Sequence, residues 1–277
     1  MLEPVQSLWV GPSLSELEIF SIKSFQKLGH KFILYTYEKV KNVPSGTIIK
    51  DGNKIIKKKD LFKFNTSFLP FSDLFRYKML YDKGGYWVDL DMIALKPLKF
   101  KEPFIFSSER TIQKGPYRHR TLKEVSNIGI LKAPKKSDFY KELYEKCLDE
   151  GTNNVKENIQ FMKTMRTILE KYNYQKYVKP AKMFCPLDWW HTKDAFYPKC
   201  CISKYGVSGY DVDSILKKSH TVHMWRSLMY KRHKIDLSQN FDERSLWEKL
   251  KKIVNDNKTK KTKKNIKRKN KTLKNKK

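Results

Sequence analysis

The chain of 277 residues contains no run of 18 or more apolar residues and only four cysteines. The first absence argues against a transmembrane helix, and the opening residues also lack the charged start and apolar stretch of a signal peptide. Cys147, Cys185, Cys200 and Cys201 show no CxxC spacing, which argues against a zinc site. We therefore expect a cytoplasmic protein in a reducing compartment, with peripheral association with a membrane left open.

Acidic residues are scarce as well. The sequence has 29 Asp and Glu against 59 Lys and Arg, which gives a formal net charge of +30. Residues 258–277 hold twelve of the basic residues and no acid, but most of the excess lies elsewhere in the chain. A basic body attracts phosphates, acidic glycans, nucleic acid or an anionic membrane surface. The alternative is a compositional bias toward Lys, Asn and Ile, with the lysines simply solvated.

The residues that are present suffice for one folded domain. Hydrophobic residues make up 39% of the chain and aromatic residues 13%, and they are spread along it. From about Asn255 the composition changes to Lys, Asn and Thr, which cannot bury a core. We expect one catalytic domain over residues 1–254 and a disordered Lys-rich tail over residues 255–277. The tail is a candidate for binding polyanions or an anionic surface.

The N-terminal part has the pattern of a strand, helix, strand unit. An apolar strand over residues 7–11 leads into a helix with a capping box at Ser13 and Glu16, which ends at Gly29. A second strand over residues 31–37 implies a right-handed parallel crossover. Further strands are expected at residues 47–50, 103–107, 127–132 and 221–225, and helices at residues 137–149 and 158–172. The fold class is therefore α/β, a single domain with a mainly parallel central sheet.

Two neighbouring segments carry charged residues in apolar surroundings. Ser72 can cap a helix that runs to Lys83 and is apolar around most of its girth. Asp73 and Arg76 lie one turn apart on this helix, and burial would require a partner or a ligand for their charges.

Asp89 and Asp91 follow at the end of an apolar strand expected over residues 86–95. Side chains alternate along a strand, so the two carboxylates should point the same way, about 7 Å apart. Hard oxygen ligands at this spacing suit Mg²⁺ or Mn²⁺, and open α/β sheets bind ligands at such strand ends.

These features together resemble a known family. The segment FSDLFRYKMLYDKGGYWVDLD, residues 71–91, resembles the DXD region of sugar transferases with the GT-A fold, a Rossmann-like nucleotide-sugar-binding fold. It is similar in particular to the group that contains α-mannosyltransferases, α-1,4-galactosyltransferases and capsular polysaccharide transferases (glycosyltransferase family 32-like). The Ser-Asp, Arg-Tyr, Gly-Gly and DXD elements stand at the expected offsets. Leu8 to Gly11, Gly29-His30 and His223 to Trp225 fit the same pattern, so the resemblance covers roughly residues 7–230.

The resemblance implies a metal-dependent glycosyltransferase of glycan biosynthesis. It would transfer a sugar from a UDP- or GDP-sugar to a glycan or other hydroxyl acceptor, with retention of configuration. Mn²⁺ or Mg²⁺ would be held by Asp91, Asp89 and His223, with His220 as a weaker candidate, and Trp9 would face the nucleotide base. The implied catalytic residues are Asp89, Asp91, Asp73 and Arg76, and the implied donor-binding residues are Trp9, Gly11, Asp73, Arg76, Asp89, Asn127, His223 and Trp225.

Two other classes of protein share part of the pattern. Phosphatases of the haloacid-dehalogenase type also place Asp-x-Asp after an apolar strand, but Ile93 stands where Thr or Val is usual. The charge and the aromatic residues fit a nucleic-acid-binding or polyanion-binding protein, but no zinc, helix-turn-helix or RNA-binding signature accompanies them. Salt-sensitive DNA binding without binding of a sugar nucleotide would favour this second alternative.

Overall fold

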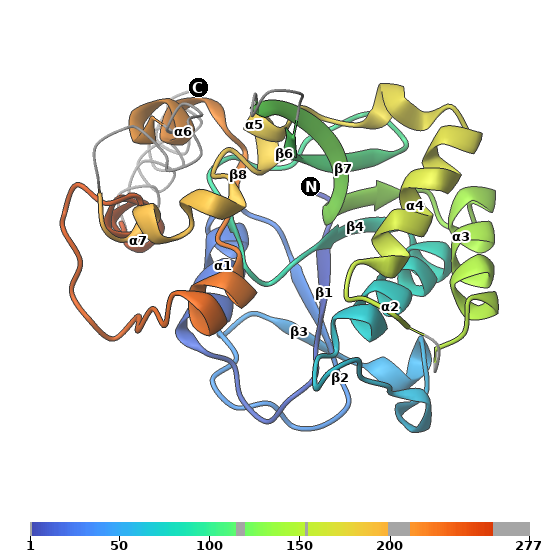
Figure 1. Cartoon of the computed structure of the whole chain (residues 1–277). Helices are drawn as coiled ribbons and strands as arrows, with labels where there is room; N and C mark the ends of the chain where they lie inside the picture. The colour runs from blue at the N-terminus through green and yellow to red at the C-terminus, as the bar shows by residue number, and fades with distance from the viewer. Residues whose placement is uncertain (1, 115–119, 153–154, 199–210, 257–277) are drawn as a thin grey trace, which may run out of the picture.

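A six-stranded sheet in the order β3-β2-β1-β4-β7-β6 runs through the centre of the computed structural model (Figure 1). The structure describes residues 2–114, 120–152, 155–198 and 211–256. Strands β3, β2, β1 and β4 are parallel, whereas β7 is antiparallel to both β4 and β6. The strands are β1 Val5–Trp9, β2 Phe32–Thr36, β3 Ile48–Asp51, β4 Gly85–Val88, β5 Met92–Ala94, β6 Ile105–Lys114, β7 Arg120–Ala133 and β8 Thr221–His223. The prediction of an α/β fold with a mainly parallel central sheet is confirmed.

Helices cover both faces of this sheet, with α1 and α7 on one side and α2, α3 and α4 on the other (Figure 1). Phe75 of α2, Phe139 of α3 and Phe161 of α4 belong to one buried apolar cluster, and Phe20 of α1 and Trp247 of α7 belong to another. The helices are α1 Glu16–Lys27, α2 Leu69–Lys83, α3 Asp138–Asp149, α4 Gln160–Lys171, α5 Ala181–Phe184, α6 Val212–Lys218 and α7 Leu246–Asn255. Within the described ranges, none of the helices is long and apolar enough to cross a membrane.

The starts of two helices differ from the prediction. Ser15 and Glu18, not Ser13 and Glu16, form the capping box of α1. Both pairs have the same spacing, but Ser13 instead forms an isolated bridge to Lys41, so the helix starts after it.

Helix α2 begins at Leu69, three residues before the predicted cap at Ser72. Pro70 is tolerated in the first turn because the N–H groups there have no partner within the helix. Gly84 ends α2 at a φ of +65°, and a Cβ atom there would lie 2.6 Å from the backbone nitrogen of Lys135. This position therefore requires glycine.

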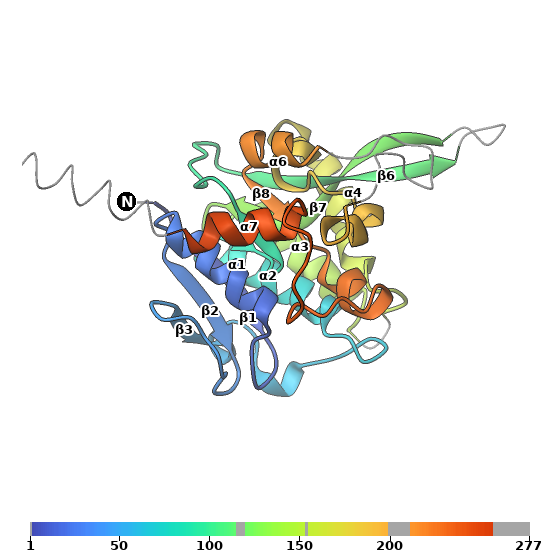
Figure 2. The ribbon, with the colours of Figure 1, turned by 90° about the vertical axis from the view of Figure 1, so that its left-hand side faces the viewer.

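The strand predicted over residues 86–95 is in fact two strands. Strand β4 ends at Val88, and after a turn the chain continues as β5, which leaves the central sheet and pairs with β8. Asp89 and Asp91 thus lie in the turn and not in a regular strand. Strands β6 and β7 are also longer than predicted, and they form a hairpin that extends beyond the body of the protein (Figure 2).

The C-terminal part contains helices α5, α6 and α7, which the sequence analysis did not predict. Helix α7 continues to Asn255, one residue beyond the proposed domain boundary at residue 254. Residues 257–277, most of the proposed tail, lie outside the described residues. Cys147 and Cys185 are buried free thiols, and Cys200 and Cys201 also lie outside the described residues.

Candidate active site

The carboxyl ends of β1 and β4 meet at the point where the connections of the sheet change sides. Helix α1, which follows β1, covers one face of the sheet, and α2, which precedes β4, covers the other (Figure 1). Ligands of open α/β sheets bind in the crevice formed at such a switch point. Trp9 ends β1 and Asp89 directly follows β4, so both residues lie at this crevice.

Asp89, Asp91 and His223 meet there. One ligand atom from each of the three side chains can be chosen so that all lie within 4.8 Å of one another. His223 Nε2 lies 3.2 Å from Asp91 Oδ2, and the same oxygen accepts a 2.8 Å hydrogen bond from the backbone N–H of Arg226. Pairing of Met92 in β5 with His223 in β8 fixes this meeting of distant segments.

The buried side chain of Arg76 forms an ion pair with Asp89. Arg76 Nη1 lies 2.9 Å from Asp89 Oδ1 and donates to the carbonyl of Ile128 at 2.7 Å, while Nη2 lies 3.0 Å from Asp73 Oδ1. It also donates hydrogen bonds to the carbonyl and hydroxyl of Ser72, and its guanidinium lies 4.8 Å from the centre of the Trp87 ring. The N–H groups of Arg76 are thus used within the protein, and Asp73 and Asp89 share one cation.

The surroundings shift the pKa values of the acidic groups in different directions. Burial raises the pKa of Asp73 to about 7, and the charge of Arg76 only partly opposes this. Burial also raises the pKa of Asp89, again against the charge of Arg76. Burial acts in the same direction on Asp91, but the charge of His223 and hydrogen bonds from His223 and Arg226 together bring its pKa below the usual value.

His223 is the cationic partner in this group. Burial disfavours its protonation, but the adjacent carboxylate of Asp91 outweighs burial and raises the pKa of His223 well above the usual value. Its ring stacks on Trp225 with centroids 3.9 Å apart, and Trp225 Nε1 donates to the carbonyl of Leu187 at 2.8 Å.

A cleft of about 820 Å³ opens above this cluster, within the ~300–1,000 Å³ typical of small-molecule sites. It brings together every residue that the resemblance implies for the site. These residues are Trp9, Gly11, Asp73, Arg76, Asp89, Asp91, Asn127, His223 and Trp225. His220, the weaker candidate, instead packs against Phe100 and Phe184.

Trp9 forms one wall of the cleft. A Cβ atom on Gly11, whose φ is +150°, would lie only 3.3 Å from Trp9 Nε1, so this glycine makes room for the indole. The guanidinium of Arg226 lies 5.4 Å from the Trp9 ring and 5.5 Å from the Tyr230 ring. A cation therefore lies beside the flat surface on which a base could stack.

Arg226 and the residue that holds it were not predicted from the sequence. Glu18, fully buried in α1, accepts a 2.5 Å hydrogen bond from Arg226 Nε and a 2.8 Å bond from the backbone N–H of Ser15. The same glutamate thus caps a helix and fixes the segment that contacts Asp91. The S-x-x-E spacing could have identified Glu18 as a capping residue, but no local pattern links it to Arg226.

Glu109 and Lys231 also line the cleft without having been predicted. Asn127 is buried, and its amide nitrogen donates to Glu109 at 3.2 Å and to the sulfur of Cys185 at 3.3 Å. Its amide oxygen accepts hydrogen bonds from Ser107 Oγ and from the backbone N–H of Gly129. Asn127 therefore orients Glu109, whose carboxylate borders the cleft.

Comparison with known proteins identifies the class of enzyme. Residues 16–112 match the family model of the glycosyltransferase sugar-binding region containing a DXD motif, and this segment includes both α2 and the Asp89-Leu90-Asp91 turn. The match covers about a third of the chain and supports an enzyme of the glycosyltransferase class.

Two solved structures align with parts of the chain at low identity. The structure described as PaToxG glycosyltransferase has 13% sequence identity and a TM-score of 0.44, with 62% of this chain and 69% of that chain covered. CTP:phosphocholine cytidylyltransferase (LicC) from Streptococcus pneumoniae has 8% identity and a TM-score of 0.33, with 64% and 90% covered. None of the curated proteins compared with the sequence matches it.

Proposed function

We propose that this glycosyltransferase takes a sugar from a UDP- or GDP-sugar and transfers it to a hydroxyl group of a glycan or another acceptor, with Mn²⁺ or Mg²⁺ as cofactor. The observation that carries the proposal is the cluster of Asp89, Asp91 and His223 on the floor of the cleft. The narrower similarity to α-mannosyltransferases and their relatives, and retention of configuration, stay predictions.

The donor atoms fit a divalent cation. Two carboxylates and one imidazole, each with a ligand atom within 4.8 Å of the others, offer the oxygen-rich set that Mn²⁺ and Mg²⁺ accept, and Mn²⁺ also suits imidazole. When bound, the metal would supply positive charge to the diphosphate of the donor. Arg76 supports this role, because it fixes the orientation of Asp89 from inside the protein.

The other residues divide between binding and positioning. Trp9 offers a flat ring for the nucleotide base, and Arg226 and Lys231 bring cationic groups to the same cleft, where they would offset charge that develops on the departing diphosphate. Asp73 borders the cleft with a carboxylate oxygen that Arg76 does not contact, and this oxygen is available for a hydroxyl of the donor sugar. Arg76 itself we assign to positioning, because its N–H groups already have partners.

A donor screen tests the proposal. The purified protein is incubated with Mn²⁺ and each common UDP- or GDP-sugar, and release of nucleoside diphosphate is measured with and without candidate acceptors. We expect slow hydrolysis of one donor that stops when the metal is chelated. Release that is equally fast without a divalent ion would contradict the metal-dependent proposal, and the identity of the released nucleotide distinguishes the donors.

A further inference from the structure

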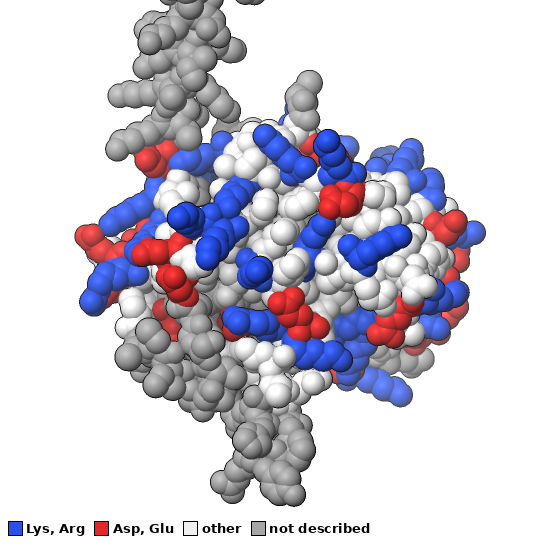
Figure 3. Space-filling view, turned by 90° about the horizontal axis from the view of Figure 1, so that it is seen from above, with Lys and Arg blue, Asp and Glu red and all other residues white. Residues whose placement is uncertain are grey.

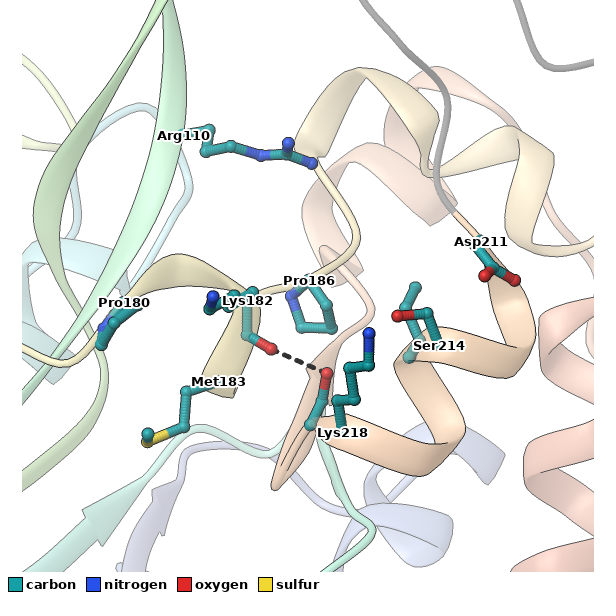
Figure 4. Close-up of a pocket in the computed structure, with 10 residues that line it drawn as sticks. Arg110, Pro180, Lys182, Met183, Pro186, Asp211, Ser214 and Lys218 are labelled. Carbon is teal, nitrogen blue, oxygen red and sulfur yellow. Dashed lines mark hydrogen bonds between the residues drawn. The ribbon is translucent and has the colours of Figure 1, made fainter.

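A second cavity of about 350 Å³ lies between β6, α5 and α6 (Figure 4). Arg110 reaches toward it from β6, Lys218 and Ser214 border it on α6, and Lys182 and Pro186 lie between these two sides. None of the residues that line it lines the cleft with the two aspartates. The volume falls at the lower end of the range for small-molecule sites.

The cations of this cavity have unused hydrogen-bonding capacity. Arg110 donates hydrogen bonds from Nε and Nη2 to the carboxylate of Asp188, at 2.7 and 2.5 Å. Its Nη1 has no partner among the described residues. Among the described residues, the exposed ammonium groups of Lys182 and Lys218 have no hydrogen-bond or ion-pair partner. Asp211 is the acidic residue among those that line the cavity, and its Oδ1 accepts a hydrogen bond from the backbone N–H of Asp213.

The surrounding surface has the same sign of charge. Seen from above, on the side where α5 and α6 lie in Figure 1, Lys and Arg side chains outnumber Asp and Glu (Figure 3). Lys96 belongs to this neighbourhood, because its ammonium donates to the carbonyl of Lys218 at 3.0 Å. Such a surface attracts anions and raises their local concentration at the cavity.

The segment of residues 186–189 runs from the cavity to the cleft with the two aspartates, which we call the donor cleft. Pro186 faces the cavity and Trp189 faces the cleft. Between them, the carbonyl of Leu187 holds Trp225, which stacks on His223, and the carboxylate of Asp188 holds Arg110. A ligand that engages Arg110 therefore contacts a segment that also positions a residue of the donor cleft.

We propose that the cavity between β6, α5 and α6 is a second site, which binds a small phosphate-bearing ligand through Arg110, Lys182 and Lys218 and acts on the donor cleft through residues 186–189. Three cationic side chains match a multiply charged phosphate better than a single carboxylate. The Ser214 hydroxyl supplies a neutral donor at the same wall. Binding at this site does not depend on the proposed transfer reaction.

The first experiment measures binding of inorganic phosphate to the full chain by calorimetry, with EDTA present so that no divalent ion supports binding in the donor cleft. Lys218→Ala removes a cation that lines the cavity, and Lys217→Ala removes the same charge from the neighbouring exposed residue of α6, which does not line it. We expect roughly ten-fold weaker binding in Lys218→Ala and near-normal binding in Lys217→Ala. Equal affinities in the two variants, or no saturable binding to the unmodified protein, overturn the site. Citrate in place of phosphate distinguishes a carboxylate ligand, and tighter binding of citrate would overturn the assignment to phosphate.

The second experiment tests the coupling, which does rest on the proposed function. The affinity of the nucleoside diphosphate with Mn²⁺ is measured with and without phosphate in both variants. We expect a phosphate effect in Lys217→Ala that is lost in Lys218→Ala, because coupled sites alter each other's affinity by the same factor. An equal effect in both variants would arise in the donor cleft itself and would overturn the coupling. Failure of the nucleotide to bind at all would count against the proposed function, and the phosphate titration would still decide the second site.

Discussion

Arg76 and Asp89 form a 2.9 Å ion pair that joins the interior of α2 to the turn after β4. Arg76 Nη2 also lies 3.0 Å from Asp73 Oδ1. The side chain of Arg76, only 3% exposed, is therefore paired with two carboxylates. Removal of one partner from a buried network of this kind costs roughly 3–5 kcal/mol, because the other charges stay buried without compensation. The turn with Asp89 and Asp91 is therefore held from inside the protein before any ligand arrives.

Replacement of Asp91 tests the metal site. Asp91→Asn keeps an oxygen that can accept the hydrogen bond from the backbone N–H of Arg226, but it removes the charge that a divalent cation needs. We expect binding of Mn²⁺ and donor hydrolysis to fall by roughly a hundred-fold or more, and the melting temperature to fall as well, because protonated His223 loses its buried partner. Asp60→Asn, at an exposed acid that is not among the residues lining the cleft, is the control. Unchanged metal-dependent turnover in Asp91→Asn would remove this residue from the metal site.

Arg76→Lys separates positioning from simple stabilisation. Lysine keeps the charge but loses the planar fork, so it cannot hold Asp73, Asp89 and the carbonyl of Ile128 at once. We expect turnover to fall by about ten-fold or more, together with weaker Mn²⁺ binding through a misplaced Asp89. Melting temperature, Mn²⁺ affinity and donor hydrolysis are measured on one preparation. A lower melting temperature with normal metal affinity and turnover would show that Arg76 only stabilises the fold.

Glu18→Gln tests the connection between α1 and the cleft. Both oxygens of Glu18 accept hydrogen bonds, one from Arg226 and the other from Ser15, so the amide of glutamine must turn its NH₂ group toward one of these donors. We expect a loss of about 1–3 kcal/mol in the free energy of unfolding and weaker binding of the nucleoside diphosphate. Glu16→Gln, an exposed position in the same helical turn, should change neither. Equal effects of the two substitutions would refute the special role of Glu18.

The C-terminal boundary can be set by truncation. Lys27 donates hydrogen bonds to the carbonyls of Ile253 and Asp256, and Val254 is buried, so the first 256 residues should be retained. We expect truncation after Asp256 to preserve both melting behaviour and donor hydrolysis, whereas truncation after Ser245 removes the fully buried Trp247 and should unfold the protein. A large loss of stability on removal of residues 257–277 would show that the proposed tail is structural. Loss of binding to a polyanion alone would support a tethering role.

His30 should make stability depend on pH. The backbone N–H of Leu98 donates to His30 Nε2 at 3.0 Å, so Nδ1 carries the proton and donates to the carbonyl of Glu3 at 2.8 Å. Burial lowers the pKa of His30 below its usual 6.5, which means that the unfolded chain binds the proton more readily. The stabilisation is present above a pH of about 6.5 and is lost as the pH falls below it. Thermal melts at a series of pH values should show a flatter dependence in His30→Gln than in the unmodified protein, and equal dependence would contradict this role.

The sequence predicted the parts of the site that follow from local rules. Asp73 and Arg76 share a helical turn, and Asp89 and Asp91 follow a buried strand, so both pairs could be identified without knowledge of the fold. The reason given for the two aspartates was nevertheless incorrect in detail, since the chain leaves the sheet at Asp89. Alternation along a strand cannot predict where pairing with one neighbour ends and pairing with another begins.

Contacts between distant segments were beyond the sequence. The pairing of β5 with β8 decides that His223, and not His220, meets Asp91. Glu18 and Arg226 likewise meet only because the segment after β8 packs against the start of α1. No periodicity or spacing encodes such contacts, because each depends on the packing of the whole domain.

The short pairing of β5 with β8 also determines when, during synthesis of the chain, the candidate site can be completed. The two aspartates leave the ribosome long before Thr221–His223, so an unfinished chain has the turn but not the strand that completes it. Contacts between residues so far apart in sequence form late, because closing a long loop loses entropy before the new contacts can stabilise the chain. A nascent chain therefore acquires the third side chain of the proposed metal site only when most of the domain has been made, so the proposed activity should begin only once folding is complete.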